Sequence, residues 1–217
     1  MKLRQLIPPE TWDELLRIGT RRVFRADSPL MLQGEPPTFV LALTEGTVKI
    51  TEDTDDGRQV PLALRGPGDL FGETGVLLEQ PRSATAWTTT RCVGHAIPAP
   101  TFRSFAERCK LHTDIYRLSV ARFLQREEHL SNLLCHTPDV RMARLLGHLA
   151  DEVGEPQGAN VVIHIGMSRE ELGLMVRMSR ATAIDTLHRL QSLGLIRCGR
   201  KRIEVLNRSA LQRYSSD

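Results

Sequence analysis

The chain has 217 residues, of which 41% are hydrophobic and 25% are charged, as in an ordinary globular protein. This length allows one large domain or two small ones. The sequence contains no apolar run of the roughly 18 residues that a membrane span needs, and no signal-peptide stretch near its start. We therefore expect a cytoplasmic protein with no membrane partner.

Residues 9–18 have the pattern of a short amphipathic helix, with Trp12, Leu15, Leu16 and Ile18 on its apolar side. After it come short β-rich runs separated by turn signals such as Glu45-Gly46. These runs are residues 39–44, 47–51, 60–64, 84–88 and 92–97. Their rhythm predicts a β jelly roll or small barrel, which we assign to a domain of residues 1–110.

The cysteines carry no sign of a metal site. Cys92, Cys109, Cys135 and Cys198 lie far apart, without a C-x-x-C pair or a His at ligand spacing. An iron–sulfur cluster needs several clustered thiolates. We therefore expect reduced thiols and no metal.

Residues 99–136 lack Gly and Pro after Pro100 and predict one long helix. Apolar residues recur on it at alternating spacings of four and three, which is the pattern of a coiled-coil seam. The seam residues are Tyr116, Val120, Phe123, Glu127, Leu130 and Leu134, and Glu127 is the one residue that does not fit the apolar pattern. We expect residues 111–137 to form a dimerisation helix and hinge, with Glu127 paired to the partner subunit's Arg126 or the partner subunit's Arg122. The alternative is that the stripe packs on the protein's own β-domain.

Thr137-Pro138-Asp139 marks the start of a new helix, because Thr can cap it, Pro suits its first position and Asp suits its positive end. We assign residues 138–217 to a second domain. Its helix ends before Gly154, and residues 161–165 predict a short strand.

Two short helices and a hairpin follow. Ser168-Arg169-Glu170-Glu171 is a capping box, and Ser179 is a second N-cap after a tight turn at Arg177. In the helix of residues 180–191, Ala183, Leu187 and Leu190 predict the buried side. Residues 195–206 predict a hairpin with Arg200 and Lys201 at its tip. This order is typical of a winged helix-turn-helix.

The charge distribution agrees with a DNA-binding end. Residues 1–137 hold 17 basic and 17 acidic residues, whereas residues 138–217 hold 12 and 9, so the whole net charge of +3 lies in the last third. Residues 177–213 hold nine basic residues and only two acidic ones, Asp185 and Glu204. Such an excess attracts a polyanion. The alternatives are a solvated charged surface and a helical hairpin that packs on the barrel without contacting DNA.

The stretch 167–206, with S-R-E-E-L-G and S-R-A-T-A-I-D-T-L-H-R-L, resembles the cyclic-AMP receptor protein/FNR family of bacterial transcription regulators, and the resemblance covers essentially the whole chain. It implies phosphate contacts by the residues matching Arg169, Ser179 and Thr182, and guanine recognition by Arg180. Ala181, Asp185 and Arg177 depart from the family pattern of Glu, Arg and Gly. We therefore expect an operator that differs from the usual half-site. The full predicted DNA-binding set is Arg169, Ser179, Arg180, Ala181, Thr182, Asp185, His188, Arg200 and Lys201.

Gly72-Glu73-Thr74 and Arg82-Ser83 resemble the phosphate-binding cassette of cyclic-nucleotide-binding domains. Arg82 matches a cyclic phosphate, and Glu73 can accept a ribose hydroxyl. The long helix of cyclic-AMP receptors offers Thr and Ser to the base. Here the matching positions are Arg126, Glu127 or Glu128, which argues against cyclic AMP itself. A cyclic nucleotide bound at Gly72, Glu73, Thr74, Arg82, Ser83, Glu127 and Glu128 is one alternative, and an empty pocket closed by a Glu73–Arg82 ion pair is the other.

Two other function classes fit the sequence less well than a regulator. A cupin-type enzyme needs a His-x-His pair and a carboxylate in the barrel, whereas the β-region has only His95. A nucleotide-binding module of a larger complex would not explain the basic hairpin. We therefore predict a homodimeric, non-enzymatic transcription regulator that binds a near-palindromic DNA operator, with RNA polymerase as a partner implied by the resemblance.

Overall fold

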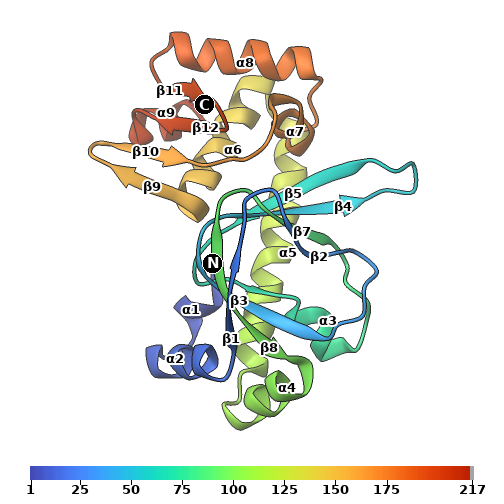
Figure 1. Cartoon of the computed structure of the whole chain (residues 1–217). Helices are drawn as coiled ribbons and strands as arrows, with labels where there is room; N and C mark the ends of the chain where they lie inside the picture. The colour runs from blue at the N-terminus through green and yellow to red at the C-terminus, as the bar shows by residue number, and fades with distance from the viewer. Residues whose placement is uncertain (216–217) are drawn as a thin grey trace.

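The computed structural model describes residues 1–215, and the side chains of all of these except 129–132 and 134. A β-domain lies at one end, the long helix α5 (His112–Cys135) runs along it, and a smaller unit of helices and one sheet lies at the other end (Figure 1). The predicted α+β class, with a jelly-roll β-domain followed by a winged helix-turn-helix, is confirmed.

The β-domain consists of two four-stranded antiparallel sheets, in the orders β1-β8-β3-β6 and β2-β7-β4-β5. The five predicted runs coincide with β3, β4, β5, β7 and β8. The strands β1, β2 and β6 were not predicted, because two of them are only two or three residues long and β1 is exposed on both faces. The bounds are β1 Thr20–Phe24, β2 Pro29–Met31, β3 Phe39–Glu45, β4 Val48–Asp53, β5 Gln59–Arg65, β6 Leu70–Phe71, β7 Thr85–Thr88 and β8 Cys92–Pro98.

Apolar side chains fill the space between the two sheets and the space beneath the helices. Leu41, Leu43 and Val48 are fully buried between the sheets. Trp12 and Phe102 belong to a second cluster, where helices pack on the other face of the first sheet. Those helices are α1 (Leu3–Leu6), α2 (Pro9–Arg17), α4 (Ala99–Arg108) and α5, and the short helix α3 (Glu73–Leu78) follows β6.

The single long helix predicted for residues 99–136 is wrong in one respect. The chain forms two helices, α4 and α5, separated at Lys110, whose φ is +53°. The backbone N–H of Leu111 donates to the carbonyl of Ala106, which closes the end of α4. A lysine in the left-handed region carries no sequence signal comparable to a glycine, so the sequence does not indicate the break.

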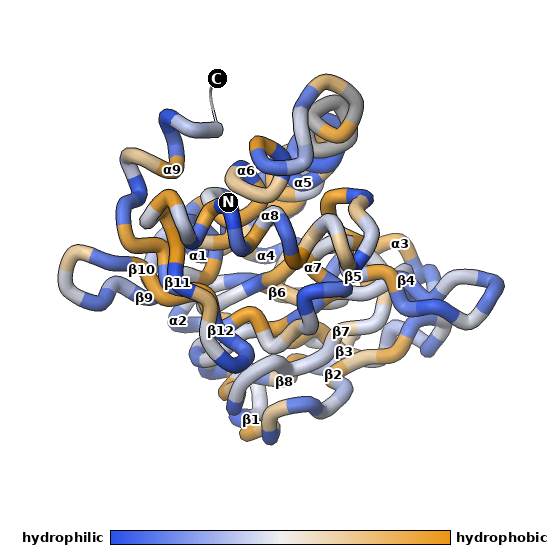
Figure 2. Tube along the Cα trace, turned by 90° about the horizontal axis from the view of Figure 1, so that it is seen from above, coloured by the Kyte–Doolittle hydropathy of each residue, from blue (hydrophilic) through white to orange (hydrophobic). Residues whose placement is uncertain are grey.

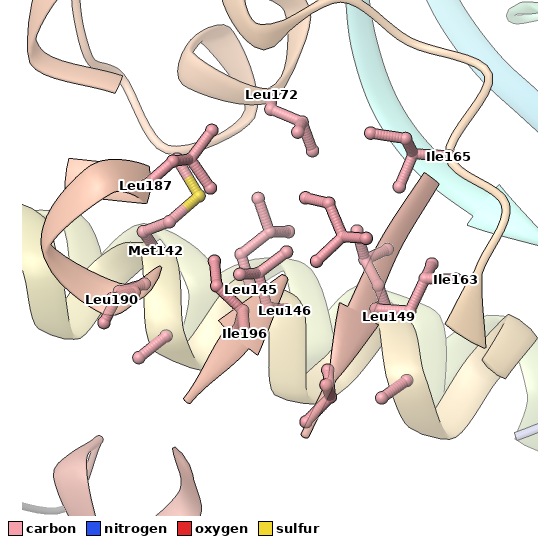
Figure 3. Close-up of a cluster of buried hydrophobic side chains, with 14 of the residues drawn as sticks. Met142, Leu145, Leu146, Leu149, Ile163, Ile165, Leu172, Leu187, Leu190 and Ile196 are labelled. Atoms are coloured by element: carbon pink, nitrogen blue, oxygen red, sulfur yellow. The ribbon is translucent and has the colours of Figure 1, made fainter. Parts of the chain in front are cut away.

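The C-terminal unit packs around α6 (Pro138–Val153). Met142, Leu146, Leu149, Ile163 and Leu187 are among the side chains that meet in its core (Figure 3). The other elements are β9 (Gly154–Gln157), β10 (Asn160–Ile163), α7 (Arg169–Met175), α8 (Arg180–Ser192), β11 (Ile196–Gly199), β12 (Arg202–Val205) and α9 (Arg208–Tyr214). The sheet has the order β11-β12-β10-β9. The strand β9 and the helix α9 were not predicted from the sequence.

The two units touch along β5 and α7. Leu64 of β5 belongs to the core of the C-terminal unit, and the α-amino group of Met1 lies 2.9 Å from Glu152 of α6. The surface loops at the end of the β4–β5 hairpin and at the turn between β11 and β12 are hydrophilic (Figure 2). Within the described part of the chain, no helix combines the length and apolarity required to traverse a bilayer.

Candidate functional site

Two capping interactions and a tight turn place α7 and α8 next to each other. Ser168 Oγ accepts from the Glu171 N–H at 3.1 Å, and Glu171 Oε2 accepts from the Ser168 N–H at 2.8 Å. Ser179 Oγ accepts from the Thr182 N–H at 3.1 Å at the start of α8. Arg177 takes φ +49° in the turn, as expected where the family has glycine. The result is a helix-turn-helix.

Gly173 allows the two helices to approach closely. A Cβ at this position would lie 3.0 Å from the Cβ of Ala183 and 3.1 Å from the carbonyl oxygen of Met178. Ala183, Leu187 and Leu190 are buried, as predicted. Arg189 donates through Nε and Nη2 to the two carboxylate oxygens of Asp139 in α6, which ties α8 to the core helix.

The opposite side of α8 faces away from the β-domain (Figure 1). Arg180, Ala181, Asp185 and His188 are exposed there, and Thr182 is half-buried. Arg169 and Ser179 are exposed at the starts of α7 and α8. This surface can therefore meet a large partner without rearrangement of the core.

The hairpin of β11 and β12 turns at Arg200 and Lys201, because Gly199 pairs with Arg202. Both tip residues are exposed, and Lys201 has φ +55°. Lys201 Nζ lies 3.0 Å from Asp27 Oδ2 in the β-domain. One predicted phosphate contact is thus engaged with an acidic side chain of the β-domain in this structure.

The predicted effector residues lie around a cleft of about 1030 Å³ between the β-domain, α5 and α6. Six of the seven line it, namely Gly72, Glu73, Thr74, Arg82, Ser83 and Glu128. Glu127 is exposed on α5 and is not among the residues that line the cleft. The volume is in the range of pockets that hold small molecules.

Arg82 is held in the cleft by backbone carbonyls. Its Nη1 donates to the Gly72 oxygen at 2.8 Å and its Nη2 donates to the Phe39 oxygen, while the guanidinium stacks on the Phe39 ring. Burial lowers the pKa of Arg82, and the nearby carboxylates of Glu35 and Glu73 oppose this change. A buried guanidinium so placed is suited to an anionic group.

Glu73 has a different partner from the one considered in the sequence. Its buried carboxylate accepts from Arg122 Nη1 of α5 at 2.8 Å, and Arg122 Nη2 donates to Asp69 at 3.0 Å. Among the described residues no Glu73–Arg82 ion pair is formed, so the ion pair considered in the sequence analysis is wrong. Burial raises the pKa of the fully buried Asp69, and Arg122 and Arg65 oppose this change.

Arg122 and Asp69 were both missed as site residues. Arg122 lies one turn after Leu118, which is fully buried on the inner face of α5, and this spacing was the available signal. Asp69 stands in the approach Gly66-Pro67-Gly68, where it accepts from the Gly66 N–H at 3.1 Å. The sequence gives no indication that Arg122 and Asp69 form an ion pair.

Several apolar side chains of α5 are uncovered, and one of them, Phe123, also lines the cleft. Tyr116, Phe123 and Leu124 are 69%, 60% and 58% exposed. Of the seam side chains that the structure describes, none belongs to the core that α5 forms with the β-domain; that inner face consists of Leu111, Ile115 and Leu118. The side chains of Leu130 and Leu134 lie outside the described residues. Arg122 is committed within its own chain, which removes it as the expected partner of Glu127.

The four cysteines lie in different surroundings, from buried Cys92 to exposed Cys135. The described residues contain no group of three or more His, Cys, Asp or Glu side chains arranged to hold a metal ion. All four cysteines are unpaired, and burial raises the pKa of Cys92 and Cys198. His95 Nδ1 lies 2.8 Å from the carbonyl oxygen of Leu16, which is a structural contact.

Comparison with known proteins places both halves of the chain. Residues 21–109 match the cyclic nucleotide-binding domain, and residues 140–214 match the Crp-like helix-turn-helix domain. The cAMP-activated global transcriptional regulator CRP of Salmonella typhimurium is 30% identical over 190 residues, which cover 84% of this chain and 87% of that protein. Relatives of this kind are transcription regulators and not enzymes, as predicted.

Solved structures agree with this assignment. FixK2 from Bradyrhizobium japonicum has a similar fold, with a TM-score of 0.75, 21% identity and coverage of 90% of this chain and 96% of that one. The c-di-GMP responsive global regulator CLP of Xanthomonas campestris gives a TM-score of 0.68 at 25% identity, with coverage of 92% and 99%. The chain therefore belongs to the Crp/Fnr family of transcription regulators, with a cyclic nucleotide-binding domain followed by a helix-turn-helix DNA-binding domain.

Proposed function

We propose that the chain is one subunit of a cytoplasmic homodimer that binds a near-palindromic DNA operator and responds to a nucleotide effector. Residues 1–110 form the effector domain, residues 111–137 the dimerisation helix and hinge, and residues 138–217 the DNA-binding domain. The observation that carries the effector proposal is the cleft that Arg82 and Ser83 of the β-domain line together with Arg122 of α5.

The DNA-binding part of the proposal assigns two kinds of contact. Arg180 reads a guanine in each half-site, while Arg169, Ser179, Thr182, Arg200 and Lys201 contact phosphates or the groove edge. The half-sites lie about one or two helical turns apart, roughly 10 or 21 base pairs from centre to centre. RNA polymerase is the expected protein partner by resemblance to the family.

Ala181 and Asp185 set the operator apart from the usual half-site. Ala181 gives no polar group to the base that it faces, and Asp185 repels phosphate unless it accepts from a cytosine amine. His188 lies one turn further along the same exposed face. Selection from a random DNA library would recover a sequence that departs from the family consensus at these bases. Recovery of the unmodified consensus would contradict the assignment.

The effector proposal rests on the chemistry of the cleft. The guanidinium of Arg82 and the hydroxyl of Ser83 suit a cyclic phosphate, and the carboxylate of Glu73 suits a ribose hydroxyl once it shares or releases Arg122. Relatives named above are described as cAMP-activated and as c-di-GMP responsive, which favours a nucleotide of this general kind.

Thermal unfolding of the full chain with a panel of cyclic mono- and dinucleotides tests this part. A ligand at about 100 times its dissociation constant adds roughly 2.7 kcal/mol to the free energy of unfolding. Arg82→Ala is expected to remove this stabilisation. The matched control is Arg91→Ala, at an exposed arginine whose side chain pairs with the exposed Glu45. If no nucleotide stabilises the wild type, the cleft is a closed structural network and the effector proposal fails.

A further inference from the structure

A second arginine of α5 follows the one that binds Glu73. Arg126 lies four residues after Arg122, and residues four apart share one face of a helix, about 6 Å apart along its axis. Arg126 lines the same cleft as Gly72, Thr74 and Arg82. A nucleotide with its phosphate at Arg82 and its ribose near Glu73 would therefore direct its base towards Arg126.

An acidic side chain accompanies Arg126 at this end of the cleft. Glu52 of β4 also lines the cleft, and its Oε2 lies 3.6 Å from Arg126 Nη2. The pair is loose, and the side chains of Arg126 and Glu52 are 61% and 48% exposed. The guanidinium of Arg126 and the carboxylate of Glu52 therefore lie next to each other. Because both side chains are partly exposed, both can rotate towards a bound base.

The two purines present different edges to such a pair. Guanine carries the acceptors O6 and N7, which match the two parallel donors of a guanidinium, whereas adenine places an amino group beside N7. Guanine also has donors at N1 and N2, which match a carboxylate. Adenine has an acceptor at N1, which a carboxylate repels.

We infer that Arg126 and Glu52 form a base-recognition pair that selects a guanine nucleotide over the corresponding adenine nucleotide. This inference rests on the proposed effector function, and it names the class of effector. It also gives Arg126 a role that differs from that of Arg82: Arg82 supplies affinity for any cyclic phosphate, and Arg126 decides which base accompanies it.

Calorimetric titration of the full chain with two matched ligand pairs tests the inference. The pairs are cyclic GMP with cyclic AMP, and cyclic di-GMP with cyclic di-AMP. One bidentate arginine contact discriminates between bases by roughly ten- to a hundredfold. We expect the guanine member of the bound pair to bind more tightly by about this factor.

Variants separate base recognition from phosphate binding. Arg126→Gln should bring the guanine-to-adenine ratio close to one while Arg82-dependent binding remains, and Glu52→Gln should lower the ratio in part. The control is Arg117→Gln, at an exposed arginine of α5 that does not line the cleft. It should leave the ratio unchanged.

The outcomes are distinguishable. Equal or tighter binding of the adenine member, still abolished by Arg82→Ala, would overturn the base inference and leave the effector proposal intact. An unchanged ratio in Arg126→Gln would likewise overturn it. Failure of all four nucleotides to bind would refute the effector proposal and the inference with it.

Discussion

Arg122 of the long helix donates to Glu73 of the cassette at 2.8 Å, and the two residues are 49 positions apart in the sequence. The same guanidinium binds Asp69, so one side chain of α5 neutralises two buried carboxylates of the β-domain. The helix expected to mediate dimerisation is therefore coupled directly to the cleft expected to bind the effector.

Removal of this guanidinium is predicted to destabilise the fold strongly. Arg122→Met removes the guanidinium that is hydrogen-bonded to both buried carboxylates and leaves only the more distant charge of Arg65, which costs about 3 kcal/mol of the free energy of unfolding. Adding Asp69→Asn should recover part of the loss, because one of the two charges is then absent. Denaturant unfolding measures both changes. The control is Arg117→Met on the exposed side of α5, whose free energy of unfolding should lie within about 0.5 kcal/mol of that of the wild type. Equal destabilisation by Arg122→Met and Arg117→Met would contradict the account.

The contact between β4 and α7 predicts a pH dependence. Lys49 donates to Glu171 at 2.5 Å. Burial tends to raise the pKa of Glu171, but hydrogen bonds from Lys49 and the Ser168 backbone outweigh it and hold the pKa below its ordinary value of 4.5. The ionised pair therefore stabilises the fold above that value, and the contribution is lost as the pH falls through the folded-state pKa.

Lys49→Met removes the pair and should lower the free energy of unfolding by about 1 kcal/mol at neutral pH. The difference from the wild type should shrink once Glu171 is protonated in both proteins. Urea unfolding across the acidic range measures it. A difference that is constant with pH would show that Lys49 acts only through packing of its aliphatic stem.

The local elements of this fold were predictable, whereas the contacts between them were not. The capping residues Ser168 and Ser179 act within three residues of themselves, so their roles follow from the sequence alone. The Arg122–Glu73 pair depends on how α5 packs on the β-domain, and the Lys201–Asp27 contact joins residues 174 positions apart. No local pattern encodes either pairing. The break between α4 and α5 was equally hidden, because Lys110 adopts the left-handed conformation that a glycine usually marks at the end of a helix.

Gly72 is predicted to be irreplaceable for two separate reasons. Its φ is +77°, and a Cβ there would lie 2.2 Å from Arg82 Nη1. Gly72→Ala should therefore cost about 1–3 kcal/mol of stability and displace the guanidinium that we assign to the phosphate. Gly34 has φ +82°, and a Cβ there would meet no atom within 4 Å. Gly34→Ala is the control: it should cost about 1 kcal/mol of stability and leave nucleotide binding unchanged. A Gly72→Ala variant that binds nucleotide normally would contradict the assignment of Arg82 to the phosphate.

The exposed apolar face of α5 predicts the oligomeric state. Phe123→Glu places a carboxylate in the middle of the proposed dimer seam and should produce monomers in sedimentation velocity. Gln125→Glu adds the same charge about 200° around the helix and should leave the dimer intact. Dimers of equal strength in both variants would show that the subunits associate elsewhere.

Variants in the β11–β12 hairpin and variants in α8 should change DNA binding in different ways. Lys201→Ala removes a phosphate contact that in this structure is engaged with Asp27. It should weaken binding to all DNA sequences and reduce the salt dependence by about one counterion per site. Loss of binding at one base pair only would contradict the phosphate role of Lys201.

The most direct test of the account is the base preference of Arg180. The operator is selected from a random DNA library, and the affinities of wild type and Arg180→Ala are compared on it and on versions with single base pairs replaced. The account predicts a loss of about 1–3 kcal/mol per half-site, with discrimination relaxed at one guanine in each half. Wild-type affinity and selectivity in Arg180→Ala, or a library that yields no consensus, would contradict the claim that α8 reads the operator.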